Sequence, residues 1–368
     1  MFNLKKKNFG KLDKTLVVVL LVLIIFGLIV LFSATKSLTN KGIFGQIVAT
    51  ILGFISILFI VLIDIDFIKK IYLYIYLVCN FLLLLVLLFG VGSEQWGSDS
   101  WLQIGPITFQ PSEIVKIGFI LSVARFIEIN QKNINKPKTL LKVLVFALIP
   151  IFMIYKQPDV GTAMVFVFML VIMLFTAGLN LKYFLGALIA GIASLPFLYL
   201  SLEEFQKKRI LTFLNPEHDI SDSSYQAIQG KIAIGSGKFF GKGFLKGSQN
   251  MYNFIPEKQT DYIFPVLVEE FGFLGGGVVI FLYGMLLHRF VVISRNSNQM
   301  YSKLVIMGFA AMFLFHIFEN IGMTLGLMPV TGIPLPFFSY GGTFQLINLI
   351  SIGIILSVSI QKEALSFE

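Results

Sequence analysis

Residues 15–34 read TLVVVLLVLIIFGLIVLFSA, a run of 20 residues without a charged side chain. A helix of this length rises about 30 Å, which matches the hydrocarbon core of a bilayer. The lysine-rich start before this run resembles that of a signal peptide. The run is long for a signal peptide, however, and it lacks a convincing small-residue cleavage site. We therefore predict a retained membrane-spanning helix.

The composition extends this prediction to the whole chain. Of the 368 residues, 56% are hydrophobic and 13% are charged, whereas soluble domains carry about 25% charged residues. The single cysteine, Cys79, excludes a disulfide within the chain. We predict an all-α polytopic membrane protein that forms one membrane domain over residues 1–368. Ten apolar windows are long enough to be transmembrane helices: 15–34, 43–63, 71–91, 112–129, 140–155, 160–177, 181–201, 262–293, 303–325 and 343–360.

The basic residues predict the orientation of these ten spans. An even number of spans places both chain ends on one side of the membrane. The segments on that side contain seventeen Lys and Arg residues, against three in the short loops opposite (Lys36, Lys41 and Lys156). Because short cytoplasmic loops carry an excess of Lys and Arg, we predict that both ends are cytoplasmic. The same topology accounts for the net charge of +9 without nucleic acid.

One outer segment, residues 202–261, is far longer than the others. It is rich in glycine and contains eight basic residues. Long loops escape the positive-inside rule, so topology does not explain this charge. Two interpretations stay open. The segment is either a solvated loop or an outward-facing anion site in which backbone N–H groups and basic side chains bind phosphate.

Several ionisable residues lie at the ends of predicted spans. In WLQIGPITFQPSEIVKIGF, residues 101–119, Pro111 suits the first turn of a helix, and Glu113 favours its positive end. Lys116 lies on the same face, so a pair with Glu113 is allowed, and the alternative is that Lys116 reaches acids of other spans. Asp159, in QPDVGTA, is placed either to cap the sixth span or to act in a site.

Polar residues also recur in the ninth predicted span and after it. His316, Glu319 and Asn320 have helical spacing and form one stripe that should face protein rather than lipid. The following stretch, residues 326–343, holds three prolines and four glycines. Such backbone cannot lie exposed in hydrocarbon, so this stretch is either an outer loop or a re-entrant segment that lines a cavity.

The stretch PEKQTDYIFPVLVEEFGFLGGG, residues 256–277, contains three acids at different depths. Pro265 predicts either a kink or a helix that begins close to it, with Asp261 just outside on irregular backbone. Glu269 and Glu270 lie roughly 12–13 Å deeper and on other faces of the helix. We therefore interpret Asp261 as the candidate for chemistry. The two glutamates are interpreted as buried structure, with at least one of them paired with Lys116.

The sequence offers little for metal or nucleotide binding. The three histidines are scattered, and no histidine or cysteine motif for a metal is present. GSGKFFGKGFLKG, residues 235–247, lacks the spacing of a nucleotide phosphate loop. We predict no protein-built metal centre and no nucleotide site.

Taken together, the motifs resemble those of the SEDS family (shape, elongation, division and sporulation) of bacterial membrane proteins. The resemblance covers about residues 15–360. It is carried by WLQIGPITFQPSE, QPDVGTA, RILTFLNPE, SYQAIQGKIAIGSGKFFGKGF, PEKQTDYIFPVLVEEFGFLG and NIGMTLGLMPVTGIPLPFFSYGGT. Within the family, GKGFLKGSQ and PVTGIPLPFFSYGG look more like the elongation member, RodA, than the division member, FtsW.

This resemblance implies a peptidoglycan glycosyltransferase that polymerises lipid II, a polyprenyl-pyrophosphate-linked disaccharide peptide, into a growing glycan strand. It implies a location in the bacterial cytoplasmic membrane, an active site on the outer face and a class B penicillin-binding protein as partner. The family's loop aspartate corresponds to Asp261. The chain departs from the usual pattern at Gln259, where histidine is common, and at Pro265, where alanine is usual, which puts the local geometry in question.

The residues fit that chemistry. Asp261 is the expected general base for an acceptor hydroxyl, and displacement is expected to be direct, with inversion. A helix N-terminus would lower the pKa of Asp261 and burial would raise it, and the sequence leaves the outcome open. The sequence requires no cofactor; any divalent cation, Mg²⁺ or Mn²⁺, would bridge Asp261 and the pyrophosphate, but its set of ligands is incomplete in the sequence. Four basic residues are expected to bind the pyrophosphate: Arg209, Lys231, Lys242 and Lys258.

Two other functions remain as alternatives. A lipid II flippase would use the intramembrane polar residues Lys116, Glu269, Glu270 and Glu319 as a path for the head group. The basic and glycine-rich features gather on one face, however, whereas a flippase needs access from both. The other alternative is a non-catalytic scaffold for the crosslinking partner.

Overall fold

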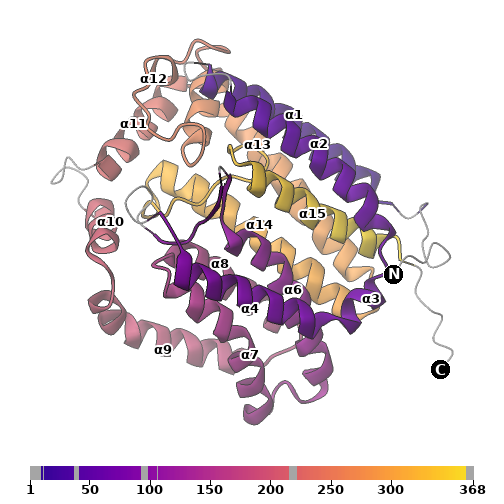
Figure 1. Ribbon diagram of the computed structural model, residues 1–368. Coiled ribbons are helices and arrows are strands. Elements are labelled where there is room, and N and C mark those ends of the chain that lie inside the picture. Colours follow the sequence, from indigo (N-terminus) through magenta and orange to yellow (C-terminus); the bar gives the residue numbers. More distant parts are fainter. Residues whose placement is uncertain are drawn as a thin grey trace.

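The computed structural model shows a bundle of long helices with smaller elements at one end (Figure 1). Basic residues at positions 5–7, 11 and 362, which contribute to the predicted orientation, lie outside the described part of the chain. The structure describes residues 10, 12–36, 41–92, 98–105, 107–214 and 222–361.

Each of the ten predicted windows coincides with a helix. The helices are α1 (Lys14–Thr35), α2 (Lys41–Leu62), α4 (Tyr72–Phe89), α6 (Pro111–Asn130), α7 (Pro137–Tyr155), α8 (Val160–Thr176), α9 (Leu181–Leu200), α13 (Ile263–Arg295), α14 (Met300–Leu325) and α15 (Gly342–Ser359).

Helix length and composition identify an integral membrane protein. In the described part of the chain, seven helices are long and apolar enough to cross a bilayer, namely α1, α2, α4, α7, α13, α14 and α15. Helix α8 and the stretch Leu181–Phe197 of α9 are apolar but shorter. Helix α6 is less apolar because it carries charged residues, among them Glu113, Lys116 and Arg125. The predicted number of ten spans therefore stays a prediction.

Helix α1 packs antiparallel to α13, whereas α2 packs parallel to α15, and α1 begins at the end of the bundle where α15 ends (Figure 1). Helix α1 runs beside α13, and at its start the Asp13 carboxylate accepts a 3.0 Å bond from Nε of Arg289. Helix α2 runs beside α15, from a contact of Gln46 with Gly341 to a contact of Ile63 with Ser357. The end of the bundle that holds Gln46 and Gly341 is called the site end below.

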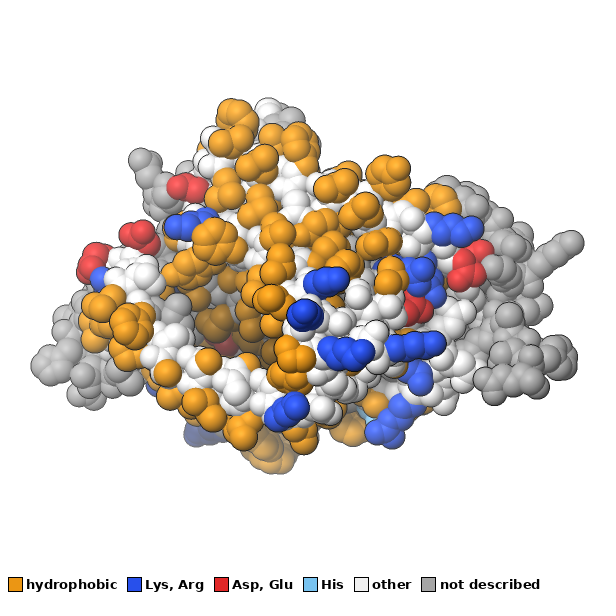
Figure 2. Space-filling view, turned by 90° about the horizontal axis from the view of Figure 1, so that it is seen from below, with side chains coloured by type: hydrophobic (Ala, Val, Ile, Leu, Met, Phe, Trp, Pro, Cys, Tyr) orange, Lys and Arg blue, Asp and Glu red, His pale blue; other side chains and the backbone are white. Residues whose placement is uncertain are grey.

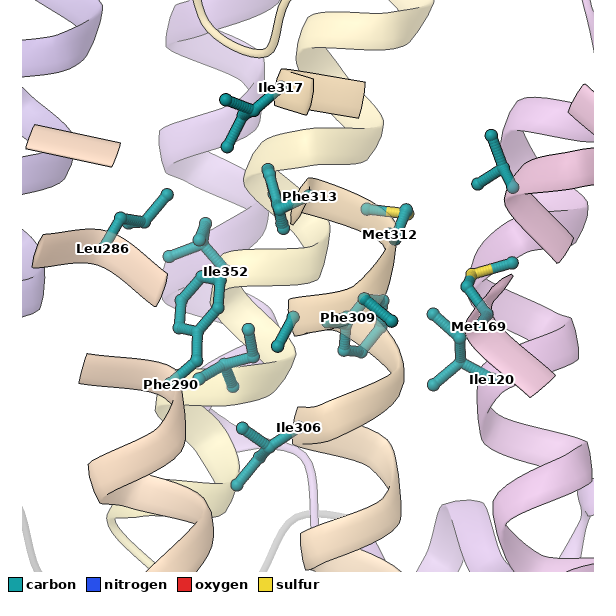
Figure 3. Packing of buried hydrophobic residues seen from close by; sticks show 14 of the residues in the cluster. Ile120, Met169, Leu286, Phe290, Ile306, Phe309, Met312, Phe313, Ile317 and Ile352 are labelled. Carbon is teal, nitrogen blue, oxygen red and sulfur yellow. The ribbon is translucent and has the colours of Figure 1, made fainter. Parts of the chain in front are cut away.

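Helix α14 lies at the centre of the bundle. Its buried side chains pack on those of α6, α8, α13 and α15, as Figure 3 shows for Phe309, Met312 and Phe313. Gly308 allows α6 to approach, since a Cβ there would lie 2.8 Å from Ile120. A central helix whose side chains are buried on every face needs such neighbours on every side. The polar stripe on α14 is therefore held within the protein.

The outer segment, residues 202–261, is partly helical where the structure describes it, that is, outside residues 215–221. It contains α10 (Glu204–Leu214), α11 (Asp222–Gly237) and α12 (Ser248–Met251), none of which the sequence analysis predicted. Before α6, the antiparallel strands β1 (Leu102–Ile104) and β2 (Ile107–Phe109) form a hairpin that was also not predicted. The remaining elements are α3 (Ile65–Lys70) and the 3₁₀ turn η3 (Gln131–Asn133).

Helix α9 stands apart from the bundle and leads into α10 (Figure 1). Apolar side chains project from every side of α9, such as Leu188, Ile192 and Phe197, which is 75% exposed. In a membrane protein such a surface suits contact with lipid. Figure 2 shows a hollow in the half of the molecule that contains α9 and α10. Hydrophobic side chains line the hollow, and an acidic side chain is visible at its floor.

Helix α13 is broken at Gly272 rather than kinked at Pro265. Gly272 has φ 71°, ψ −171°, a conformation that favours glycine. Pro265 occupies the third position of the helix, in the first turn, where its missing N–H costs no helical hydrogen bond. Of the two predictions for Pro265, the one with a helix that begins close to it is confirmed.

Candidate active site

Asp261 lies at the site end, two residues before the start of α13. It is half-buried on irregular backbone, as predicted. The side-chain amide of Asn320 donates a 2.9 Å hydrogen bond to the Asp261 carbonyl oxygen. A Cβ at Gly332 would lie 3.4 Å from Asp261 Oδ2, so the chain passes close to this carboxylate. The carboxylate therefore faces a loop that follows α14.

That loop, residues 326–341, fixes the backbone on either side of Thr260. It starts at Gly326, whose left-handed conformation ends α14. The Tyr340 N–H donates a 2.7 Å bond to the carbonyl of Gln259. The Ser339 hydroxyl donates a 2.5 Å bond to the carbonyl of Thr260. Three consecutive carbonyls, at residues 259–261, are thus held by groups from α14 and this loop.

The second half of this loop, residues 333–339, is a largely buried, re-entrant segment, which was one of the two predicted alternatives, whereas Leu327 in the first half is 71% exposed. Leu335, Phe337 and Phe338 are almost completely buried. A Cβ at Gly27, in the middle of α1, would lie 2.1 Å from the Phe337 carbonyl oxygen. The Tyr283 hydroxyl, from α13, donates a 2.5 Å bond to the carbonyl of Pro336. Irregular backbone is tolerated here because protein groups satisfy it.

A second acid, Asp159, lies at the start of α8. Its side chain accepts a 3.0 Å bond from the Thr162 N–H, so the predicted helix cap is confirmed. Its other oxygen accepts a 2.9 Å bond from Gln110, the residue before α6. Gly161 lets this helix start approach Thr331, which would lie 3.4 Å from a Cβ. Asp159 therefore borders the same loop as Asp261.

Arg209, on α10, brings a cation to the two acids. Burial lowers the pKa of its guanidinium, while the charges of Asp261 and Asp159 act in the opposite direction. Reciprocally, Arg209 favours the ionised form of both carboxyl groups. Arg209 therefore interacts electrostatically with both Asp261 and Asp159, which lie at the starts of two different helices. The sequence analysis predicted Arg209 as a residue of this site.

The environment gives Asp261 an unusual proton affinity. Burial raises the pKa of Asp261 to about 7, the Glu257 charge adds to this effect, and Arg209 opposes it. Burial also raises the pKa of Asp159, against the opposing hydrogen bonds from Thr162 and the charges of Lys116 and Arg209. The sequence left open whether the helix N-terminus or burial dominates at Asp261. Burial dominates, because the side chain lies outside the first helical turn and caps no N–H.

Below the two acids lies a buried charge cluster. Lys116 donates a 2.8 Å bond to Glu113, which confirms the predicted pairing within α6. The Lys116 ammonium also lies 3.0 Å from Nε2 of His316, whose Nδ1 is 3.2 Å from the carbonyl oxygen of Pro334. The cluster therefore connects α6 and α14 to the re-entrant loop.

The predicted polar stripe on α14 is confirmed as internal. His316, Glu319 and Asn320 are all buried. Glu319 accepts a 2.8 Å bond from the Thr331 hydroxyl. Asn320 donates to Ile333 as well as to Asp261. These side chains position the re-entrant loop. Because Glu319 is hydrogen-bonded within the protein, it gives no support to a path for the lipid II head group through a flippase.

The predicted pairing of Glu269 or Glu270 with Lys116 is wrong. Lys242, from the outer segment, donates a 2.7 Å bond to Glu269. Glu270 accepts a short hydrogen bond from Ser33 of α1. Lys116 is held by neighbours on α6 and α14, on another side of α13. Helical spacing placed the two glutamates inside the protein but could not select their partners.

The four predicted pyrophosphate ligands separate in the structure. Arg209 interacts with Asp261. Lys242 donates to Glu269, and Lys258, which is buried, donates a 2.5 Å bond to the carbonyl of Asn250. Lys231 is exposed on α11 and lies against Gly326, where a Cβ would be 2.2 Å from its Nζ. The structure thus engages Lys242 and Lys258 in internal contacts and leaves Arg209 as the cation beside the acids.

Several residues of the site escaped the sequence analysis. Gln110, Thr331, Gly332 and Ser339 lie in stretches that were quoted as motifs, but no role was assigned to them. The one available signal was position, since Gln110 directly precedes a helix-starting proline and the other three lie in the proline- and glycine-rich segment.

Comparison with known proteins identifies the family. The model of the FtsW/RodA/SpoVE family, described as "Cell cycle protein", matches residues 13–364. The chain belongs to this family. The SEDS assignment from the motifs is therefore confirmed.

Relatives of this SEDS protein carry different names within the family. Stage V sporulation protein E of Bacillus subtilis is 35% identical over 94% of this chain and 96% of its own length. The peptidoglycan glycosyltransferase MrdB of Escherichia coli is 34% identical, over 99% and 98%. A probable peptidoglycan glycosyltransferase FtsW of Trichlorobacter lovleyi is 33% identical, over 98% and 96%. These identities do not separate the paralogues.

Solved structures share the SEDS fold. One is a chain from a peptidoglycan synthase complex whose structure addresses coordination of polymerization and crosslinking. It superposes with a TM-score of 0.82 at 28% identity, over 95% of this chain and 97% of that one. The rod shape determining protein RodA of Thermus thermophilus gives a TM-score of 0.73 at 27% identity, over 96% and 98%.

Proposed function

We propose that this SEDS protein is a peptidoglycan glycosyltransferase that polymerises lipid II at the outer face of the bacterial cytoplasmic membrane. Family membership and the glycosyltransferase relatives support the activity. The observation that carries the mechanism is Asp261, a half-buried acid with a pKa raised to about 7 beside Arg209. A general base works best when its pKa lies near the operating pH.

In the proposed reaction, ionised Asp261 accepts the proton of an acceptor sugar hydroxyl. The hydroxyl oxygen then forms a bond to the anomeric carbon of the donor, on the face opposite the leaving group. The anomeric carbon–oxygen bond to the pyrophosphate breaks, and its electron pair leaves with the polyprenyl pyrophosphate. Such a direct displacement inverts the anomeric configuration and needs no covalent intermediate.

Arg209 is the proposed ligand for the pyrophosphate. A guanidinium binds phosphate oxygens through paired N–H donors and retains its charge under all physiological conditions. Because it interacts with Asp261 and Asp159, it can hold the leaving group close to the base. The hollow in Figure 2 has apolar walls and lies in the half of the molecule that contains α9 and α10, so it is the proposed place for the polyprenyl chain.

A divalent cation bound with the pyrophosphate would have Asp261 as its ligand from the protein. In the part of the chain that the structure describes, no three His, Cys, Asp or Glu side chains gather into one group. A cation bridging Asp261 and pyrophosphate would depend on substrate oxygens for most of its ligands, since divalent cations of this kind take about six.

The biological role that we propose is elongation of the cell wall with a class B penicillin-binding protein. The similarity to RodA and MrdB supports elongation. The similarity to a chain from a peptidoglycan synthase complex supports a partner that crosslinks the strands. The division role of FtsW is the alternative, because FtsW relatives have similar identity. The placement of the site end on the outer face follows from the positive-inside distribution of Lys and Arg.

Labelled lipid II and the purified protein, with and without a class B penicillin-binding protein, test the activity. Wild-type protein is expected to form glycan strands, Asp261→Asn none, and Arg209→Ala strands only at much higher lipid II concentration. Asp66→Asn, on α3 at the opposite end of the bundle, is the control and should be fully active. Equal polymerisation by wild type and Asp261→Asn would refute the base. Transfer of lipid II across vesicle bilayers without polymer would favour a flippase.

A further inference from the structure

The break in α13 at Gly272 is filled by the outer segment. A helix interrupted at Gly272 leaves N–H groups without their usual partners four residues back. Phe273 donates a 2.8 Å bond to the carbonyl of Lys238, and Leu274 a 3.2 Å bond to that of Phe239. A turn that follows α11 thus supplies the acceptors that the helix itself cannot.

The carbonyls above the break are satisfied by the same turn. Lys242 N–H donates a 2.9 Å bond to the carbonyl of Glu269, and Gly243 N–H a 3.0 Å bond to that of Glu270. Gly241 is required for this approach, since its Cβ would lie 2.2 Å from the Glu270 carbonyl oxygen. Four backbone bonds therefore join the outer segment to α13, two on each side of the break.

The Glu269 side chain adds an ionic connection at the same place. It is fully buried and accepts the 2.7 Å bond from the Lys242 ammonium. It also accepts bonds of 3.0 and 3.2 Å from the N–H groups of Gln249 and Asn250, in the first turn of α12. A carboxylate at these N–H groups is favourable in both hydrogen bonding and charge.

Asn250 contacts the segment that contains Asp261. Its carbonyl accepts a 2.5 Å bond from the ammonium of Lys258, which also donates 2.8 Å to Asn253. Burial lowers the pKa of Lys258 to about 8, and the charges of Glu270 and Glu269 oppose this effect. Lys258 lies three residues before Asp261. Contacts thus run from Glu269 through Asn250 to Lys258, and three residues of chain then connect Lys258 to the base.

We propose that Glu269 is a positioning residue for the proposed base: by holding α12 and, through it, Lys258, it fixes Asp261 in its half-buried place. This inference rests on the proposed function of Asp261. The re-entrant loop and Asn320 hold the same segment from the other side. If the contacts through Lys258 are lost, the bonds from Asn320 and the re-entrant loop keep the segment of Asp261 attached, but its position becomes more variable.

A more variable position of Asp261 should alter the pKa of its carboxyl group as well as its geometry. The groups that act on its carboxyl are Glu257 and Arg209, with Asn320 and Gly332 packed beside it. Burial is the largest cause of its raised pKa. A looser segment admits water, so the pKa falls toward that of an ordinary carboxyl group. A role limited to overall stability would leave this pKa unchanged in the molecules that remain folded.

The test is the variant Glu269→Gln in polymerisation assays with labelled lipid II. Rates are measured from about pH 5 to about pH 9, a range that brackets the pKa expected for the base. Glutamine keeps the size of the side chain but presents an NH₂ group to N–H donors and leaves Lys242 without its counter-charge. We expect kcat to fall about 100-fold, KM for lipid II to stay unchanged, and the acid limb of the pH profile to move to lower pH. An unchanged kcat, or a reduced kcat with the wild-type acid limb, would overturn the proposal.

Two further variants complete the experiment. Glu204→Gln is the matched control because Glu204 also pairs with a lysine of the outer segment, Lys207 at 2.9 Å, but its side chain is 91% exposed. It should behave like wild type. If Glu269→Gln does not fold, Lys258→Met tests the next contact in the line by the same criteria.

Asp261→Asn, assayed in parallel, separates the two proposals. If Asp261→Asn is inactive and both Glu269→Gln and Lys258→Met retain the wild-type kcat and acid limb, the positioning role alone fails. If Asp261→Asn is as active as wild type, the proposed base fails and the positioning role fails with it.

Discussion

The side-chain amide of Asn320 donates one hydrogen bond of 2.9 Å to the Asp261 carbonyl and a second of 2.8 Å to the Ile333 carbonyl. Asn320 is completely buried on α14. One amide therefore joins the segment of the base to the re-entrant loop that faces it. The two segments are more than 70 residues apart in the chain, and this amide joins them next to the bonds that Ser339 and Tyr340 make to the same segment.

Asn320→Leu should impair catalysis more than folding. Leucine keeps the volume but donates no hydrogen bond, so two buried carbonyls lose their donor, at about 1–3 kcal/mol each. We expect the protein to remain folded with a lower melting temperature and a rate of polymerisation reduced by about 10-fold or more. Full activity at a lowered melting temperature would show that Asn320 only stabilises the fold.

Asp261→Asn should stabilise the protein above neutral pH. The pKa of Asp261 is raised from its ordinary 3.8 to about 7. Between these values the folded state holds a proton that the unfolded state has released, so wild-type stability falls as pH rises from about 4 to 7. The asparagine variant avoids this loss. Its melting temperature in detergent should exceed that of wild type at pH 8, and the two should converge near pH 4.

Glu113→Gln should be strongly destabilising, because it leaves the buried Lys116 ammonium without its counter-charge. Removal of one partner of a buried pair costs about 3–5 kcal/mol. The double variant Glu113→Gln with Lys116→Met should recover most of that loss, as measured by thermal unfolding in detergent. If the double variant is no more stable than the single one, then the pair is not the source of the effect.

Gly272→Ala should disrupt the junction between α13 and the outer segment. A Cβ there would lie 2.3 Å from Gly241 N and 2.4 Å from the Phe239 carbonyl oxygen, in a backbone conformation that strains alanine. We expect destabilisation by about 3 kcal/mol or more. Gly277→Ala, five residues further along the same helix, is the control, since apart from the local helix backbone no atom would lie within 4 Å of its Cβ. A Gly272→Ala protein with wild-type unfolding behaviour would contradict the described junction.

The features that the sequence predicted correctly depend on short separations along the chain. The apolar windows predicted the helices because a span must satisfy its own backbone in lipid. The Glu113–Lys116 pair and the Asp159 cap follow from residues three apart, which helix geometry places together. Burial of His316, Glu319 and Asn320 follows from the same periodicity. A carboxyl group at the start of a span, as at Asp261, could therefore be selected from sequence.

Tertiary structure alone decided which distant groups meet at that acid. Glu269 pairs with Lys242 rather than Lys116, because the outer segment enters the break at Gly272. The re-entrant loop descends between α1 and α13, and Arg209 approaches from a helix that the sequence did not predict. These contacts join residues far apart in the chain, which helical periodicity cannot place together. The pKa of Asp261 depends on this packing, so the acid was visible in the sequence but its chemistry was not.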